Sequence, residues 1–465
     1  MNERADNSET ENAINEIRLP VSVRSHAPSY FAASLSLSFF SALAFYLEFS
    51  LVGIMLFLTA WLVIPVSAFT DRIVFDGRRL IRTGPVPRIW SRILGLRAAI
   101  RLRSIEQIDT ATSGSLQRGG RVRFFYRTTI FGGETKLVFA GSGRKYRQMV
   151  QAVLARVDPS ILDLRSFELM MYACDPSDAV RVADRLGIPA SDVLEASLQR
   201  HDRRNFAEPV DVSATSKADA QTLRNIANRL RMSGVLVRAV EAYRRALRFE
   251  PRDPKLLFEF SRCLQTIGSV RRNRKLEHRA AGALRLADRA AQGDPELLER
   301  IAETYRQFGY NRRAAEAYHS VIDRIGDAFR SLIGLAELAL DEGKLAHVAH
   351  NFNAANRVAT TSALRRWTKA EADYFCHLNE DDEYMELEVS RLNLLERLNR
   401  WRVATFRIAI YSLPLIAFGY FFDEALLADA GWLVASVGLV VWSGINISLR
   451  IFSPRIPYEL VGEED

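Results

Sequence analysis

Apolar residues gather in two long stretches, one near each end of the chain. Residues 30–70 contain a single charged side chain, Glu48, and residues 403–450 are interrupted mainly by three acids at 423–429. About 20 apolar residues cross a bilayer as a helix, so each stretch has the length of two membrane-spanning helices. A carboxylate is costly in mid-bilayer, so Glu48 marks the expected turn of the first hairpin. The pattern predicts two transmembrane helical hairpins, one at residues 30–70 and one at 403–450.

Basic residues lie on one side of both predicted hairpins. The first hairpin is followed by a dense set of arginines: Arg72, Arg78, Arg79, Arg82 and Arg88. The turn of the second hairpin has no Lys or Arg, whereas arginines precede and follow that hairpin. Cytoplasmic loops carry an excess of Lys and Arg. We therefore expect a multi-pass protein of the inner (plasma) membrane, with its soluble domains and both termini in the cytoplasm.

The two ends of the chain are polar. Residues 1–29 are rich in acids and lack the basic start and short apolar core of a secretory signal. They predict a disordered cytoplasmic tail, and residues 451–465 predict a second cytoplasmic tail. The three cysteines, Cys174, Cys263 and Cys376, form no CxxC pair, which indicates a reducing compartment.

Residues 71–157 have the alternation of a β-rich domain closed by a helix. Asp76-Gly77 and the residues 131–134 mark two hairpin turns, residues 99–108 alternate as one strand, and residues 144–157 place apolar side chains on one helical face. The opening strands Arg72–Gly84, the segment Ile100–Asp109 and this last helix resemble the pleckstrin-homology-like domains of bacterial membrane proteins. The resemblance implies a small β-barrel that docks on proteins or membrane surfaces and has no catalytic residues.

This domain is strongly basic. It has sixteen arginines and two lysines against five acids. Such a charge next to a membrane attracts anionic headgroups by about 1 kcal/mol per basic residue near the surface. The arginines at 72, 78, 79, 82 and 88 are therefore candidate contacts to anionic lipid or to a partner. Topological bias alone, or docking of a protein, explains the same charge, and the alternatives stay open.

Residues 158–216 predict a helical linker. Pro176-Ser177-Asp178 has the capping residues of a helix start, and residues 208–218 are typical of a flexible joint. The spacing from Ala183 through Gly187 to Val193 fits a helix-turn-helix, whose second helix would enter the major groove of DNA. Asp184 and Asp192 would face phosphates there, so nucleic acid is not the expected partner.

Residues 217–360 contain an internal repeat. The helix marked by Leu223, Ala227 and Leu230 is followed by one marked by Ala239 and Tyr243. The spacing recurs in a third and a fourth unit: Leu298, Ile301, Ala302, Tyr305, Gly309, Ala314, Tyr318; Leu332, Leu335, Ala336, Gly343, Phe352, Ala355. From Ala218 to Ala359 this pattern resembles the tetratricopeptide repeat family. The resemblance implies stacked helix pairs whose concave surface binds protein segments.

The second repeat departs from the family because it carries seven extra residues within Arg271–Arg285. Seven residues are about two helical turns, so a longer helix fits, and so does a basic loop at residues 271–275. Residues 361–402 keep helical periodicity without the motif, which predicts capping helices that lead into the second hairpin. Candidate contacts to acidic peptide termini lie on the first repeat: Arg224, Arg231, Arg238, Arg245 and Arg248. Ordinary solvated helix faces are the alternative for each of them.

The chain carries no recognisable catalytic motif. It has no phosphate-binding loop; Thr112–Ser115 and Gly119-Gly120 are typical of simple turns. His347 and His350 lie one helical turn apart, but no neighbouring acid or cysteine completes a metal site. We expect no enzyme activity, no catalytic residues, no cofactor and no metal.

These patterns define the expected fold class. It is a multi-domain membrane protein with two transmembrane hairpins, a small β-barrel-like (pleckstrin-homology-like) domain and an all-α tetratricopeptide-type solenoid. The net charge of +8 fits an acidic partner. The leading hypothesis is a membrane-anchored scaffold that binds proteins of a membrane-associated assembly, with anionic lipid as a further partner. A membrane-bound DNA-reading regulator and a subunit of a transport assembly are the alternatives, and no pattern specifies an oligomeric state.

Overall fold

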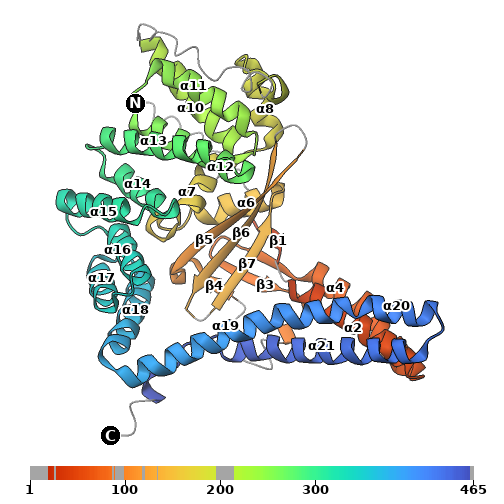
Figure 1. Ribbon diagram of the computed structural model, residues 1–465. Helices are drawn as coiled ribbons and strands as arrows, with labels where there is room; N and C mark the ends of the chain where they lie inside the picture. Colours follow the sequence, from red (N-terminus) through yellow and green to blue (C-terminus); the bar gives the residue numbers. More distant parts are fainter. Residues whose placement is uncertain are drawn as a thin grey trace. The chain divides into compact units, whose positions relative to one another are not determined.

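The computed structural model describes residues 19–25, 28–85, 88–89, 99–117, 121–133, 135–194 and 214–460. The chain divides into two compact units (Figure 1). The first unit contains the residues up to His26 together with Asp71–Ala370, and the second contains Ala27–Thr70 together with Glu371–Asp465. Each unit is therefore assembled from segments that are distant in the sequence.

The first sheet of the first unit has four antiparallel strands in chain order, β1 (Val21–Arg24), β2 (Arg72–Phe75), β3 (Arg79–Thr83) and β4 (Ala99–Arg101). Strand β1 pairs along its whole length with β2. Its residues alternate between buried Val21 and Val23 and outward-facing Ser22 and Arg24. The prediction of a disordered tail is therefore wrong for these residues, because their alternation gives an apolar face that the sheet buries.

The second sheet has three antiparallel strands, β5 (Gln107–Leu116), β6 (Val122–Gly132) and β7 (Thr135–Gly141). The predicted turn at Asp76-Gly77 is confirmed, with Gly77 at a φ of 97°. The strand expected at residues 99–108 is instead split by a 3-10 turn, η2 (Leu102–Ser104), and its halves lie in different sheets. Residues 112–115 lie within β5 rather than in a turn, while Gly119-Gly120 lies outside the described residues.

The helix α6 (Arg144–Leu154) shares one hydrophobic core with both sheets. It contributes Tyr146, Met149, Val150, Val153 and Leu154, as its apolar spacing predicts. Among the described residues, a single bridge, between Ser25 and Phe139, links the two sheets, and their described strands do not close into a barrel. The predicted barrel is therefore wrong, because the 3-10 turn leads the chain away from β4 before β4 can pair with β5.

The region expected as a linker is packed structure over most of its described length. It forms the 3-10 turn η3 (Pro159–Ile161), α7 (Leu164–Tyr172) and α8 (Pro176–Arg185). The carboxylates of Asp163 and Asp175 cap the two α-helices by accepting backbone N–H groups. Helix α10 already begins at Ala214, so the flexible joint is wrong for residues 214–218, and residues 208–213 lie outside the described part of the chain.

The repeat region is a tetratricopeptide-like array of helix pairs (Figure 1). The pairs are α10 (Ala214–Met232) with α11 (Leu236–Phe249), α12 (Pro254–Arg271) with α13 (Arg274–Ala290), α14 (Pro295–Gln307) with α15 (Asn311–Ile325), and α16 (Phe329–Asp341) with α17 (Leu345–Val358). Helix α18 (Ser362–Glu380) follows them. Ala227, Ala239 and Tyr243 are fully buried between paired helices, which confirms that small residues let the helices approach and that the tyrosine fills the space.

The seven extra residues of the second repeat lengthen its helices. α12 and α13 have 18 and 17 residues, whereas α14 and α15 have 13 and 15. The connection between α12 and α13 is a tight turn, in which Arg272 has a φ of 51° and Asn273 caps α13. Of the two alternatives, the longer helix is confirmed and the basic loop is wrong.

The second unit is a set of apolar helices. Helix α2 (Pro28–Tyr46) is followed by a continuous helical run made of α3 (Ser50–Leu58), the π-helical η1 (Thr59–Val63) and α4 (Ile64–Thr70). The others are α19 (Asp382–Tyr411), α20 (Leu413–Phe421) and α21 (Ala425–Ile451). Within the described residues, three helical stretches are long and apolar enough to cross a membrane, Ser50–Thr70, Asp382–Phe421 and Ala425–Ile451, while Tyr30–Tyr46 is shorter.

The turns of both apolar hairpins lie where charged residues predicted them. Glu48 and Asp423 have positive φ angles of 64° and 56° and separate the paired helices. Within the first hairpin, the hydroxyls of Ser34 and Ser41 donate to the carbonyls of Ala60 (2.8 Å) and Gly53 (2.7 Å). These hydroxyls hold the two helices together.

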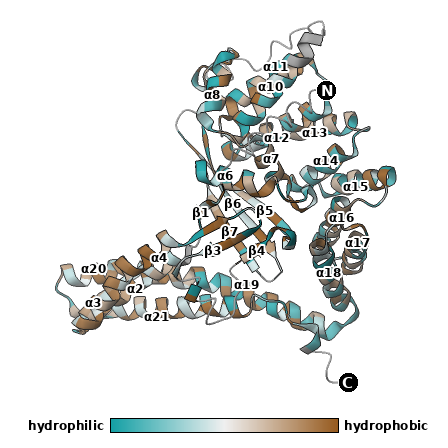
Figure 2. Cartoon of the chain, turned by 180° about the vertical axis from the view of Figure 1, so that it is seen from behind, coloured by the Kyte–Doolittle hydropathy of each residue, from teal (hydrophilic) through white to brown (hydrophobic). Residues whose placement is uncertain are grey.

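The two hairpins contact each other through aromatic side chains. The ring of Trp432 lies 5.2 Å from that of Phe39 and 5.6 Å from that of Tyr46. The hydroxyl of Tyr46 donates to Asp429. Most apolar side chains of the membrane-length helices are nevertheless exposed, and Figure 2 shows these helices as largely hydrophobic. The second unit therefore has a small interior and a large exposed apolar surface.

The C-terminal residues fold back on α18 and α19. Arg455 forms a bidentate ion pair with Glu371, at 3.1 and 2.9 Å, and its guanidinium lies 3.9 Å from the ring of Tyr374. The hydroxyl of Tyr384 donates to the carbonyl of Ile456 (2.7 Å). The C-terminal tail is therefore packed as far as these residues.

Candidate functional site

Residues 158–172, here called the docked segment, lie across the first helix of every repeat pair. The segment comprises η3 and α7, and Figure 1 shows α7 next to α12 and α14. It contacts α10 through Arg231, α12 through Glu259 and Arg262, α14 through Arg300 and Glu303, and α16 through Arg330. The first helices of the repeat pairs are therefore covered by a segment of the same chain.

Glu168 is the centre of this contact. Its carboxylate accepts hydrogen bonds from Arg231 at 2.6 and 3.2 Å, and Nη1 of Arg262 lies 2.7 Å from it. All three side chains are buried, and Arg165 lies 3.6 Å away. Burial by itself raises the pKa of Glu168, but the attraction of the three guanidinium groups outweighs it and lowers this pKa to about 2. Glu168 is therefore a buried anion shared by three cations.

Weaker polar contacts extend along the rest of the docked segment. The guanidinium of Arg300 lies 4.2 Å from the ring centroid of Phe167, within cation–π range. The backbone N–H of Leu164 donates to Glu303 (3.3 Å), and Arg330 donates to the carbonyls of Pro159 and Leu162. These contacts fix the segment at both ends as well as at its centre.

Four of the five arginines predicted to clamp acidic peptides are held inside the protein. Arg224 donates to Glu259 with both distances at 2.7 Å, and Arg231 binds Glu168. Arg238 is buried and donates to Asp184 and to carbonyls at residues 188 and 189. Arg245 donates to Glu241 and to the carbonyls of residues 186 and 187. Only Arg248 keeps an exposed position, so the prediction is wrong for the other four.

The arginines that follow the first hairpin divide into two classes. Arg82 donates to both carboxylate oxygens of the buried Asp71, with a closest distance of 2.6 Å, and is structural. Arg79 is exposed and pairs with Asp76 (3.0 Å). Arg72, Arg78 and Arg88 are exposed. The exposed members remain candidate contacts to lipid or protein, whereas Arg82 does not.

Helix α13 and the turn before it carry a cluster of exposed basic residues. Residues 271–290 contain seven arginines and lysines against two acids. Six of the basic residues are exposed on the α12–α13 turn and along α13: Arg272, Arg274, Lys275, Arg279, Arg285 and Arg289. Exposed Leu286 adds an apolar residue to this face. We call these six basic residues and Leu286 the basic face; it suits an acidic protein segment.

The remaining chemical candidates stay isolated. His347 and His350 are exposed on α17, and the described residues contain no group of three or more His, Cys, Asp or Glu that could hold a metal. Cys174, Cys263 and Cys376 are free thiols. The helix-turn-helix pattern begins in α8, but Asp184 is bound to Arg238, and residues 195–213 lie outside the described part of the chain.

The docked segment is the feature that the sequence pattern missed. Its signals were present: Asp163 is a helix-capping residue, and Glu168 stands among apolar residues on a short helix. A lone acid in such a helix gives no indication of its partner, because Arg231 and Arg262 are distant in the sequence. The sequence likewise gives no indication of which arginines of the repeats pair with a carboxylate and which face solvent.

The comparisons with known proteins are limited. No family model and no curated protein matches the chain. Among solved structures, PilF of Pseudomonas aeruginosa matches at 14% identity and a TM-score of 0.30, covering 50% of this chain and 99% of PilF. The APC/C hetero-tetramer Cut9–Hcn1 matches at 14% identity and a TM-score of 0.30, covering 65% of this chain and 51% of the matched chain. The repeat architecture described above rests on the helix pairs of this chain rather than on these likenesses.

Proposed function

We propose that this protein is a non-enzymatic, membrane-anchored scaffold that binds an acidic protein partner through its repeat array. The observation that carries the proposal is the combination of the basic face with first helices that are already covered by the docked segment. Partners then have access to the second helices, among which α13 has the largest number of Lys and Arg residues. Charge complementarity then selects an acidic segment.

Membrane anchoring is supported by the second unit. The helical stretch Ser50–Thr70 has 21 residues and a length of about 32 Å, close to the hydrocarbon thickness of a bilayer of about 30 Å. Large exposed apolar surfaces mark sites of contact with membranes or proteins. In this proposal both hairpins cross the inner (plasma) membrane, and the soluble domains and both termini are cytoplasmic.

The sheets and α6 supply the module next to the membrane in this proposal. Two antiparallel sheets and a C-terminal helix are the elements that support a pleckstrin-homology-like module in this proposal. Exposed Arg72, Arg78 and Arg88 are suited to anionic headgroups. The ion pair of the partly exposed Arg82 with the buried Asp71 instead stabilises β3.

The proposed topology predicts which positions a membrane-impermeant maleimide reaches in intact spheroplasts. The variants Leu47→Cys and Phe422→Cys, at the exposed hairpin turns, should be labelled from outside. Arg78→Cys should react only after permeabilisation, and the wild-type chain, with its three natural cysteines on the inner side, is the control. Labelling of Arg78→Cys in intact cells, or release of the protein by alkaline carbonate, would contradict the proposal.

Partner binding should depend on the basic face. Crosslinking of the full-length chain in membranes is expected to capture a specific acidic protein, and the double variant Arg274→Glu/Arg285→Glu should reduce its capture at least tenfold, because it reverses two exposed charges. Arg357→Glu/Arg366→Glu, at exposed positions of α17 and α18, is the matched control. Equal capture by both double variants, or no specific partner, would remove the proposed role of α13.

A further inference from the structure

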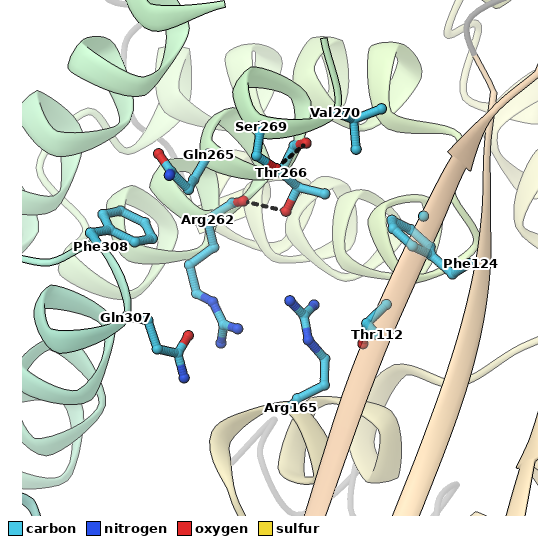
Figure 3. A pocket seen from close by; sticks show the side chains of 11 residues that line it. Thr112, Phe124, Arg165, Arg262, Gln265, Thr266, Ser269, Val270, Gln307 and Phe308 are labelled. Atoms are coloured by element: carbon cyan, nitrogen blue, oxygen red, sulfur yellow. Dashed lines mark hydrogen bonds between the residues drawn. The ribbon is translucent and has the colours of Figure 1, made fainter. Parts of the chain in front are cut away.

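A cavity of about 230 Å3 lies where the second sheet, α7 and the repeats meet. Thr112 of β5 and Phe124 of β6 line one side, and Gln265 and Val270 of α12 line another. Arg165 of α7 and Arg262 of α12 extend into it from two directions, with their guanidinium groups close together (Figure 3). All of these residues belong to the first unit.

The guanidinium groups of Arg165 and Arg262 are incompletely neutralised, because the one carboxylate beside them, Glu168, is shared with Arg231. Glu168 accepts hydrogen bonds of good geometry from Arg231, whereas Arg165 lies 3.6 Å from it. Nη1 of Arg262 lies 2.7 Å from Glu168, yet among the described residues it has no hydrogen-bond partner of acceptable geometry. Burial and the neighbouring arginines lower the pKa of Arg262 to about 10, so it is still a cation at neutral pH.

The other polar groups of the cavity differ in what they offer. The hydroxyls of Thr266 and Ser269 donate to backbone carbonyls of α12 (2.8 and 3.3 Å) and are therefore used. Gln307 donates to Glu303, the second carboxylate of this region (3.3 Å). Thr112 Oγ1 is buried and has no partner among the described residues. Its hydroxyl and the two guanidinium groups are the donors available to a ligand.

We propose that this cavity binds a small phosphorylated molecule through its phosphoryl group. The donors come from β5, α7 and α12 and so surround a point in space, which suits a tetrahedral oxyanion better than a planar carboxylate. Guanidinium groups bind phosphate oxygens with charge-assisted hydrogen bonds. Phe124, Val270 and Phe308 line the rest of the cavity and provide an apolar wall for the carbon part of such a ligand. The proposal does not depend on the scaffold function or on the membrane topology.

The test uses the full-length protein in detergent, titrated at constant ionic strength with inorganic phosphate, glycerol phosphate or acetate. Both phosphates are expected to bind saturably by calorimetry and to raise the thermal midpoint, as ligands specific for the native state do. Tighter binding of glycerol phosphate assigns the site to a phosphorylated organic molecule, and equal binding assigns it to free phosphate. Acetate that binds as tightly as phosphate, or the absence of saturable binding, would overturn the proposal.

Variants separate the site from general charge effects. Arg165→Gln should weaken phosphate binding at least tenfold, and it leaves Glu168 its two buried arginine partners, so the fold is retained. Thr112→Val, which removes the available hydroxyl, should weaken binding severalfold. Arg312→Gln, a fully solvated position on α15, is the matched control. Unchanged affinity in both Arg165→Gln and Thr112→Val would show that phosphate binds elsewhere.

Discussion

Replacing Glu168 by Gln is expected to destabilise the first unit by about 3–5 kcal/mol, the usual result of breaking a buried ion pair by removing one partner. The variant keeps the size of the side chain but leaves Arg231 and Arg262 as buried cations without a counter-ion. Thermal unfolding of the purified chain should show a lower midpoint. Hydrogen exchange should increase most in α7 and α12, where the docked segment contacts the repeats.

Two controls define this effect. Glu316→Gln removes an exposed partner of Arg312 and should change the midpoint little, because surface ion pairs contribute little.

The pKa of Glu168 lies at about 2 in the folded protein, below its ordinary value of 4.5. The stabilisation by Glu168 is therefore complete above pH 4.5 and is lost as pH falls toward 2. A difference between wild type and variant that grows on acidification would contradict this account.

Replacing Gly234 by Ala should separate the sheet from the repeats. Gly234 lies in the α10–α11 turn at a φ of 79°, and its carbonyl accepts the N–H of Val122 at 2.9 Å. A Cβ atom there would lie 1.8 Å from the carbonyl oxygen of Val122, a distance that only a backbone shift can relieve. Such overpacking costs about 1–3 kcal/mol, in addition to about 1–3 kcal/mol for the left-handed backbone.

Gly309 provides the matched comparison for this prediction. It occupies the equivalent turn between α14 and α15 at a φ of 80°, and an added Cβ meets nothing within 4 Å. Gly309→Ala should therefore show the backbone cost alone. Thermal midpoints of the two variants measure the difference. If Gly234→Ala is no less stable than Gly309→Ala, the close contact between β6 and the α10–α11 turn contributes nothing to stability.

Local patterns predicted most of the helices. The small residues Ala227 and Ala239 and the groove-filling Tyr243 identify helix pairs, because their spacing leaves few other ways to bury them. The turns at Glu48 and Asp423 follow from the cost of placing charge among apolar residues. Predictions of this kind succeed when neighbours in the sequence are also neighbours in space, as they are in helical hairpins.

The same approach failed where a contact joins distant residues. Val21 and Val23 were read as part of a tail, because their alternation is short and the partner strand β2 begins about 50 residues later. The segment at residues 99–108 alternates like one strand, and no local signal shows that η2 divides it between two sheets. Strand pairing depends on which distant strands the fold brings alongside, and a short sequence pattern does not contain this information.

The arginines show the limit most clearly. Arg231 and Arg248 have the same side chain on consecutive helices of one repeat, yet one is buried on Glu168 and the other is exposed. Arg82, within β3, pairs with the buried Asp71, whereas Arg78, in the turn before β3, is exposed. The sequence shows where each arginine is, but the role of its guanidinium depends on whether a carboxylate from another segment reaches it.

The sequence by itself determined the apolar helices, the helix pairs of the repeats and the strong positive charge, because these depend on composition and on short periodicities. Only the tertiary structure decided that residues 158–172 cover the first helices of the repeats, and that α13 presents exposed basic residues. It also placed Arg165 and Arg262 together at a cavity. The physical reason is that burial and ion pairing are properties of residues brought together in space, and Glu168 lies more than 60 residues from its nearest buried partner.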